Sequence, residues 1–379
     1  MILWKKWLQG KAFPLWSNAG FNRKRRLYHE RLTFNARPID VVDLRLMVQA
    51  RQIATFCRAQ IDGLLKQSDD PILCLAEVQK HYWHRDGEPG WIFSLTPEGL
   101  PAKITRDLYA HAFILFAHAW AYRLTGELAI LRVARETVYE VENIFSLPHG
   151  GFFDVIPSQD TIRRQNPHMH LLEAYLALFE ATQDEFYLER ARKLVELAKK
   201  TFICSQSGMI LEFLTEEWKP CKKFGNNSVE PGHIFEWSWL FSEILRLDSN
   251  FSKNINLEKN VEHLFQVGIK YGVEDAVVFD AMNEKGHITC KNTRIWPQTE
   301  LMRVLACRAK NEQIASVTEQ DLSQTLTEKF FDLYAPDVLQ GGWFDRRDSE
   351  GMVMVDHMPA SSFYHIYGAA RELCDPLTF

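Results

Sequence analysis

The sequence predicts an all-α protein: an (α/α)6 barrel, or toroid, of twelve helices with long β-hairpin-like loops at one end. Two observations predict this class. Apolar residues recur at three- and four-residue steps along most of the chain, which is the period of an amphipathic helix. Long connections that contain glycine and strand-like residues alternate with short ones, so pairs of helices repeat about every 60 residues. Six stacked pairs can close into a ring.

The inner helix of each pair should be the more apolar one, because neighbours cover it on all sides. Residues 107–125 and 235–247 are apolar nearly all round, whereas residues 185–202 have one charged face. No linker rich in Gly, Ser or Pro divides the chain, so residues 1–379 are expected to form a single domain. An open array of pairs is the structural alternative. The expected helices, of which every second one lies inside, are 17–34, 42–62, 71–85, 107–125, 127–146, 167–183, 185–202, 233–247, 257–271, 297–309, 321–334 and 361–373.

The connections indicate which end of the barrel carries the site. Four long loops precede inner helices, at residues 150–164, 207–220, 279–290 and 341–355, whereas the turns that follow inner helices are short. The long loops and the first turns of the inner helices should therefore lie at the same end.

Composition excludes several classes of protein. Lys+Arg 44 against Asp+Glu 49 leaves a charge of −5, which is not the basic surplus of a nucleic-acid-binding protein. No apolar run approaches the length of a membrane span, and Lys5 and Lys6 interrupt any secretory signal. The cysteines are an odd set of 7 without a CxxC pair, which favours a reducing, cytoplasmic location. The basic run at residues 23–26 is interpreted as a solvated helix face.

Polar clusters open four of the expected inner helices. A proline, which is favoured in a first helical turn, precedes each cluster, at Pro167, Pro231, Pro297 and Pro359. An all-apolar inner helix would not need such clusters, so we expect them to converge on one pocket. They read HMHLLE (168–173), HIFE (233–236), QTE (298–300) and SSFYH (361–365).

Three interpretations of these clusters stay open. His170 with Glu173 and His233 with Glu236 are i,i+3 pairs on one helix face, as in an ordinary polar helix start. A di-iron site would need more carboxylates, in ExxH rather than HxxE order. The third interpretation is proton transfer, because a histidine near a helix N-terminus favours its neutral form and can act as a base.

Other catalytic classes have less support. No GxSxG, P-loop or GxGxxG motif is present. A glycosidase would need two carboxylates that flank a bond, and Asp154, Glu236 and Asp345 keep that alternative open. Arg51 lies in a largely apolar helix, and if it faces inward it needs an anion or a developing oxyanion. A helical scaffold that binds a partner without catalysis is the non-enzyme alternative.

Taken together, ten segments make the chain resemble the N-acylglucosamine 2-epimerase family, which includes mannose isomerases and cellobiose 2-epimerases. They are FPLW (13–16), HERL (29–32), QARQI (49–53), YAHAF (109–113), GGFFD (150–154), NPHMHLLEAY (166–175), EPGHIFEWSWL (230–240), WPQTE (296–300), GGWFD (341–345) and HMPASSFYHI (357–366). The resemblance covers nearly the whole chain and implies an (α/α)6 barrel that acts on an open-chain sugar.

The resemblance also implies roles for individual residues. His233 and His365 correspond to the family's acid/base histidines, His170 to a histidine that holds the substrate and helps open its ring, and Arg51 to the arginine near the substrate carbonyl. Asn166, Glu236 and Glu300 fall on pocket positions. We add His111, Glu173, Trp296 and Gln298 as expected substrate-binding residues.

The function expected from these residues is the isomerisation of an aldose and its ketose, of the mannose/fructose type, through a cis-enediol. The sequence around His365 resembles that of the mannose isomerases. Ile366, Tyr367 and Gly368 follow this histidine, where the typical 2-epimerases place an arginine. A 2-epimerase of the N-acylglucosamine or mannose/glucose type and a mannose-6-phosphate isomerase are the alternatives, the latter because basic residues occur in the long loops. We expect no metal or other cofactor, a small monosaccharide as the substrate, no nucleic-acid or membrane partner, and a monomer or homodimer.

Overall fold

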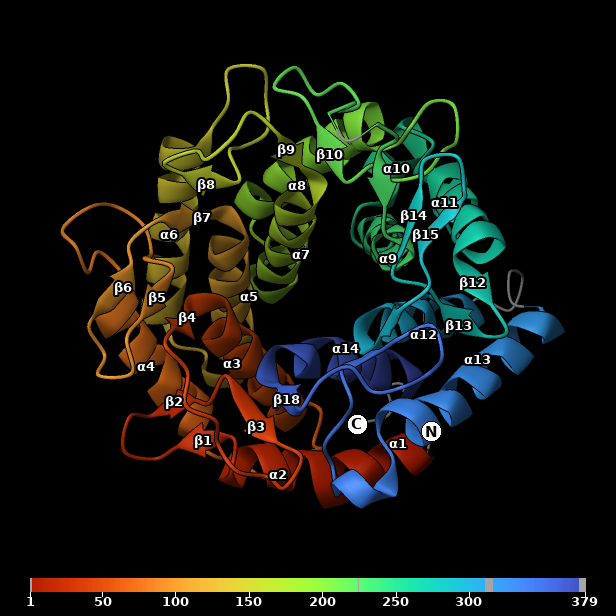
Figure 1. Ribbon diagram of the computed structural model, residues 1–379. Helices are drawn as coiled ribbons and strands as arrows, with labels where there is room; N and C mark the ends of the chain where they lie inside the picture. The colour runs from red at the N-terminus through yellow and green to blue at the C-terminus, as the bar shows by residue number, and fades with distance from the viewer. Residues whose placement is uncertain (1, 224, 311–315, 375–379) are drawn as a thin grey trace.

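Six inner helices form a closed ring in the computed structural model, which describes residues 2–223, 225–310 and 316–374 (Figure 1). Each packs against the next, and the last packs against the first. All six begin at the same end of the barrel, as the loop pattern predicts. The inner helices are α3 (Leu46–Ile61), α5 (Leu108–Thr125), α7 (Gln165–Thr182), α9 (Pro231–Leu247), α12 (Ile295–Ala309) and α14 (Phe363–Cys374).

Six outer helices surround this ring, so the twelve-helix barrel is confirmed for the described residues. A short extra helix, α10 (Ser249–Asn254), interrupts the turn after α9, and 3-10 turns occur at Asp337–Leu339 (η4) and Ala360–Ser362 (η5). The outer helices are α1 (Ile2–Trp7) continued by η1 (Leu8–Ala12) and α2 (Phe13–Asn18), α4 (Asp70–Tyr82), α6 (Leu128–Phe145), α8 (Glu185–Leu197) with η2 (Ala198–Phe202), α11 (Leu257–Gly272) and α13 (Val317–Lys329) with η3 (Phe330–Tyr334).

The first helix differs from the prediction. The sequence pattern was expected to give a helix over 17–34, but the helix spans residues 2–18 and a hairpin follows it. Trp4, Trp7 and Trp16 are buried at helical spacing, which holds this segment against the barrel. The basic run at 23–26 lies in the hairpin turn, where the Asn22 side chain accepts hydrogen bonds from two backbone amides and Arg26 has a φ of 54°. These residues are solvated as expected, but they are not helical.

Short antiparallel sheets join the long loops into a belt at one end of the barrel. In each case the strand that leads into an inner helix pairs with a strand from a neighbouring repeat, and β18 with β3 closes the belt. The paired strands are β3 (Arg31–Thr33) with β18 (His357–Pro359), β4 (Leu44–Arg45) with β5 (Ser94–Leu95) and β6 (Pro101–Lys103), β7 (Arg106–Asp107) with β8 (Val155–Ile156), β9 (Arg163–Arg164) with β10 (Phe213–Leu214), β11 (Ser228–Val229) with β14 (Ala281–Asn283) and β15 (Ile288–Cys290), and β16 (Thr293–Arg294) with β17 (Arg346–Arg347).

Two further hairpins are local to one repeat: β1 (Phe21–Asn22) with β2 (Leu27–Tyr28), and β12 (Val273–Glu274) with β13 (Val277–Val278). The apolar core fills the space between the inner and outer rings. Among the described helices, none is long and apolar enough to cross a membrane. A cytoplasmic location and a single domain over 1–379 stay predictions.

Candidate active site

The repeat places one side chain from every inner helix at the same depth. These side chains are the sixth residue of each helix, counted for α14 from the 3-10 turn η5 that leads into it. Since all six helices start from the belt of sheets, their sixth residues face the same level of the barrel axis. They are Arg51, Phe113, His170, Glu236, Glu300 and His365, and all are buried.

His365 is held in a neutral state by its surroundings. Its Nδ1 lies 2.7 Å from Oε1 of Glu300, so Nε2 is the ring nitrogen left for a substrate. Burial, together with the nearby positive charge of Arg51, holds the pKa of His365 well below its usual value. Burial also raises the pKa of Glu300 to about 7, although the guanidinium of Arg303 opposes this rise. When Glu300 is ionised it accepts the Nδ1 proton, which leaves Nε2 as a base.

His233 lies in the opposite electrostatic environment. It is the third residue of α9, and its Nδ1 lies 2.9 Å from Oε1 of Glu212. Burial would lower its pKa, but the negative charges of Glu212 and Glu230 outweigh burial and raise the pKa to about 9. Glu212 is itself fixed by Gln165, whose Nε2 donates to it at 3.0 Å. His233 is therefore a cation near neutral pH, and it can act as an acid.

A third histidine lies deeper among carboxylates. Nδ1 of His170 is 3.4 Å from Glu173 and 3.7 Å from Glu236. Burial lowers the pKa of His170 to about 4. Burial and the two neighbouring carboxylates, on Glu300 and Glu173, raise the pKa of Glu236 well above its usual value. A protonated Glu236 has a hydrogen-bond donor to offer, and its Oε2 has no protein partner.

Arg51 faces inward, and its hydrogen bonds among the described residues go to neutral groups rather than to a carboxylate. One guanidinium nitrogen donates to the carbonyl of Ser361 at 3.2 Å, and another contacts the hydroxyl of Tyr109. Its guanidinium carbon lies 4.2 Å from the ring centroid of Phe113 and 5.0 Å from that of Tyr364. Because Nε has no acceptor, the side chain keeps a donor that can stabilise a substrate oxygen.

Trp296 lies between the neutral His365 and the cationic His233. Its ring centroid lies 4.9 Å from that of His233 and 5.5 Å from that of His365. The indole is only half-buried, so it can pack against a sugar ring. Asn166 lies at the loop-rich end beside a cleft of about 420 Å³ that Tyr109 also lines, and its buried Oδ1 has no partner.

Two of the expected binding residues lie outside this cluster. His111 accepts from the amide of Trp91 at 3.0 Å and has its other ring nitrogen 2.7 Å from the carbonyl of Asp107. Gln298 accepts from the amide of Val278 at 2.9 Å and donates to the carbonyl of the same residue at 2.7 Å. With both polar ends engaged by backbone, these side chains hold loops in place.

Sequence reasoning missed four residues of the site: Glu212, Arg303, Tyr109 and Tyr364. Arg303 is buried between Glu173 (3.3 Å) and Glu300 (3.5 Å), and Tyr364 donates a hydrogen bond to Glu173. The i,i+3 spacing of Glu300 and Arg303 on an apolar helix was a usable signal. Glu212 lies in an irregular loop, and nothing in its local sequence indicates its contact with His233.

Among the described residues four groups have the geometry to hold a metal ion. One is formed by Glu212, Glu230 and His233, one lies away from the site at His84, Glu136 and Glu140, and two overlap at the centre of the site. His170, Glu173 and Glu236 bring their ligand atoms within 4.8 Å of one another, and so do Glu236, Glu300 and His365. Arg303 already occupies carboxylate oxygens of Glu173 and Glu300, which competes with a cation there. The expectation that no metal is needed stays a prediction.

The inner helices bring a neutral and a cationic histidine to Trp296, and this arrangement is suited to an enzyme of acid/base chemistry. The sequence model of the N-acylglucosamine 2-epimerase (GlcNAc 2-epimerase) family matches residues 28–369, and the chain belongs to this family.

Several relatives resemble this chain over most of its length. It is 29% identical to a mannose-6-phosphate isomerase of Rhizobium meliloti (strain 1021), over 98% of this chain and 96% of the relative. It is 26% identical to a D-mannose isomerase of Marinomonas mediterranea, over 78% of this chain and 77% of that protein. A crystal structure of a D-mannose isomerase superposes with a TM-score of 0.87 at 19% identity, covering 99% of this chain and 97% of that one.

Proposed function

We propose that the chain interconverts an aldose and its ketose, of the mannose/fructose type, by proton transfer through a cis-enediol. The observation that carries the proposal is the pair of histidines with opposite protonation. Burial beside Arg51 keeps His365 neutral, whereas Glu212 and Glu230 keep His233 charged. An enzyme that removes a carbon-bound proton and neutralises the resulting oxyanion needs one base and one acid of this kind.

The proposed reaction starts from the open-chain aldose. Nε2 of His365 removes the proton from C2, and the electron pair moves to form the C1–C2 double bond while O1 becomes an oxyanion. Arg51 stabilises that oxygen, which then takes a proton from the cationic His233. The hydroxyl proton of O2 then passes to His233, which becomes cationic again, as the C2 carbonyl forms and C1 takes the proton held by His365. No atom is gained or lost, so the product is the ketose.

Other residues of the pocket suit the cyclic form of the substrate. His170 and the protonated Glu236 lie side by side and can exchange protons with the ring oxygen and the anomeric hydroxyl, which opens the ring. The Oδ1 of Asn166 lacks a partner and can accept from a sugar hydroxyl. Trp296 offers an aromatic face to the apolar side of the sugar.

The alternatives differ in the carbon to which the proton returns, and in whether the sugar carries a phosphate at position 6. Return to the opposite face of C2 would make the chain a 2-epimerase, and the same acid and base can do this. A 6-phosphate would need free cations at the mouth. Of the loop arginines, Arg163 pairs with Glu216, Arg164 with Asp154, and Arg294 with Glu230. Arg346 lies 3.8 Å from Asp280, and Arg347 donates to the backbone carbonyl of Leu333. Because these arginines are already engaged, the unmodified sugar is the better fit.

The test is to compare kcat/KM for mannose, fructose and mannose 6-phosphate and to identify each product by chromatography. We expect mannose to give fructose, with a kcat/KM above that for the phosphosugar. A preference for mannose 6-phosphate by more than about tenfold, or about 1.4 kcal/mol in transition-state binding, would contradict the free-sugar proposal. Glucose as the product from mannose would assign the chain as a 2-epimerase, and monosaccharide release from an oligosaccharide would indicate a glycosidase.

A further inference from the structure

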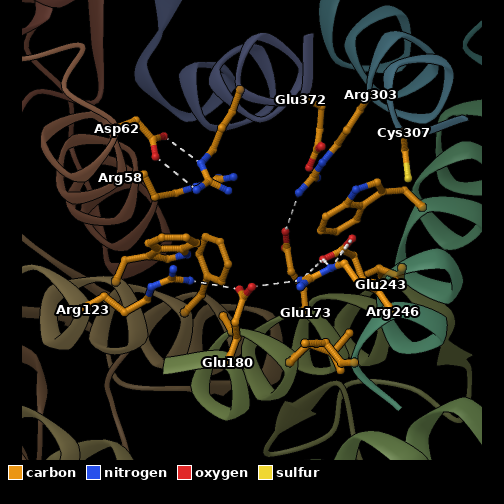
Figure 2. Close-up of a pocket in the computed structure, with 18 of the residues that line it drawn as sticks. Arg58, Asp62, Arg123, Glu173, Glu180, Glu243, Arg246, Arg303, Cys307 and Glu372 are labelled. Carbon is orange, nitrogen blue, oxygen red and sulfur yellow. Dashed lines mark hydrogen bonds and ion pairs between the residues drawn. The ribbon is translucent and has the colours of Figure 1, made fainter. Parts of the chain in front are cut away.

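A second cavity lies at the other end of the barrel from the histidines. It has a volume of about 520 Å³ and is lined by the C-terminal halves of the inner helices (Figure 2). Glu173 and Arg303 belong to both places, since they line this cavity and contact the histidine cluster through His170 and Glu300. The cavity is therefore behind the candidate active site, and nothing in the proposed reaction uses it.

Charged side chains gather in this cavity to an unusual degree. Among the described residues its lining carries six basic and five acidic side chains. Five of the cations have a carboxylate partner. These pairs are Arg371 with Asp62 at 2.7 Å, Arg123 and Arg246 each with Glu180 at 3.0 Å, Arg303 with Glu173 at 3.3 Å, and Lys310 with Glu372 at 2.8 Å. The negative ends of the helix dipoles explain why basic side chains collect here.

Arg58 is the exception to this pairing. Arg58 is 3% exposed to solvent, and its Nε and Nη1 atoms are buried without a hydrogen-bond acceptor. Its guanidinium carbon lies 5.1 Å from the ring of Trp120 and 5.6 Å from the rings of Phe116 and Tyr367. A buried guanidinium without an acceptor is costly, and rings of this kind offset only part of the cost. The helix dipoles do not explain the missing acceptor.

Two more guanidiniums stand around the same indole. Arg123 lies 4.4 Å and Arg371 lies 5.1 Å from the ring of Trp120, so three arginines from three different helices meet there. Figure 2 shows Arg58 and Arg123 pointing into the cavity on one side and Arg303 entering it on the other. An arrangement of convergent arginines over an apolar base is suited to a ligand with several oxygens.

The polar atoms that lack partners indicate the charge of a ligand that would fit this cavity. In the described lining of this cavity, every buried side-chain atom without a partner is a hydrogen-bond donor. These atoms are Nε and Nη1 of Arg58, Nε of Arg303, and the indole nitrogens of Trp120 and Trp239. The cavity therefore has a surplus of donors, and an oxyanion is the ligand that supplies acceptors and negative charge together.

We propose that this cavity is a binding site for a small phosphate-bearing anion, with Arg58 as its principal contact. The phosphate oxygens accept from the guanidinium of Arg58, and Trp120 forms the apolar floor. Inorganic phosphate and a phosphate monoester share this chemistry, and the experiment separates them. The proposal does not depend on the proposed sugar reaction, because it concerns binding at the other end of the barrel.

The test is isothermal titration of the full-length protein with inorganic phosphate and, in a separate arm, with glycerol 2-phosphate. We expect saturable 1:1 binding of at least one of the two. The tighter arm tells whether the site takes free phosphate or a monoester. The Arg58→Met variant, which keeps the length of the side chain without its charge, should bind at least about tenfold more weakly. Arg132→Met, an exposed arginine on α6, is the matched control and should bind like wild type.

Folding of the variants is checked by thermal unfolding, and a crystal structure of the wild-type protein soaked in phosphate gives a readout that needs no variant. Density for phosphate within hydrogen-bond distance of Arg58 supports the proposal. Absence of binding in both arms, equal affinity of wild type and Arg58→Met, or phosphate located only elsewhere would overturn it. Sugar turnover is not part of either readout, so failure here and failure of the proposed function are distinguishable.

Discussion

At the scale of single residues, the site depends on how neighbouring charges separate two identical side chains. His233 and His365 are both buried, and burial alone would make both neutral. The carboxylates of Glu212 and Glu230 raise the pKa of His233 to about 9, whereas Arg51 adds to the effect of burial on His365. The same imidazole group is therefore cationic on one helix and neutral on another, as the acid and the base of the proposed reaction need to be.

The pH dependence of kcat/KM should be bell-shaped as a result. Below a pH of about 7 Glu300 becomes protonated, so it no longer accepts the Nδ1 proton of His365 and activity falls. Above about 9 His233 loses its proton and no longer acts as an acid. The Glu212→Gln variant removes the charge that raises the pKa of His233, so its basic limb should move to lower pH by about one unit or more, while the acidic limb stays.

Glu216→Gln is the matched control for that shift, because Glu216 lies in the same loop, is exposed, and pairs with Arg163 rather than with a histidine. Its pH profile should match that of the wild type. A basic limb that does not move in Glu212→Gln would show that this carboxylate does not set the protonation of His233.

The sequence indicates the histidines of the site better than their partners. His170, His233 and His365 sit at helix starts where an apolar helix has no need of them, and the structure brings them into one cluster. Glu212 is 21 residues from His233 in the chain and meets it through loop geometry that local pattern does not encode. Tyr364 and Tyr109 look like core residues in the sequence, because only the ring of helices gives their hydroxyls partners.

At the scale of elements, the fourth residue of an inner helix has a recurring structural role. In four of the six inner helices its side chain bonds to the backbone of the segment that follows the preceding outer helix. The side chain of Gln49 bonds the backbone N–H and C=O of Tyr28, each at 2.8 Å. The side chain of Gln298 bonds the same two groups of Val278, at 2.9 and 2.7 Å. His111 and His168 accept from the amides of Trp91 and Phe152, each at 3.0 Å.

This role predicts what replacement of His111 would do. In His111→Ala the amide of Trp91 would be left buried without an acceptor, which costs about 1–3 kcal/mol of folding free energy. Chemical denaturation measures the loss, and KM for the sugar should stay close to that of the wild type. His263→Ala, at an exposed position on α11, should change neither quantity. A large rise in KM with unchanged stability would instead restore the expected binding role of His111.

The inner helices are well predicted because they are apolar on all sides, and this pattern survives any uncertainty about their ends. The first outer helix is the element whose position the sequence pattern predicts wrongly. Residues 2–18 alternate tryptophans with lysines and contain Gly10 and Pro14, so they lack the usual helix signals. Tertiary packing makes this segment helical, since it holds the tryptophans against aromatic rings far along the chain. The ring centroid of Trp4 lies 4.5 Å from that of Phe330, and the ring of Trp16 stacks on that of Trp343 with centroids 5.0 Å apart.

At the scale of the whole molecule, ring closure gives the barrel two chemically distinct ends. The belt of sheets fixes the starts of the inner helices, and the sixth residues then meet at one level. The other end holds the arginine-lined cavity, and the buried Arg303 with its two carboxylates separates the two. The number of helix pairs follows from the sequence repeat, but the depth at which side chains meet requires the closed ring.

The central claim, proton transfer by His365 through an enediol, is tested most directly by incubating the protein with mannose in D2O and following the products by NMR. The account predicts deuterium at C1 of fructose or at C2 of recovered mannose, because the proton held by Nε2 exchanges with solvent between its removal and its return. In His365→Gln both conversion and labelling should fall by about 10²–10⁴-fold. Conversion without label at either carbon, or wild-type labelling in His365→Gln, would contradict the account.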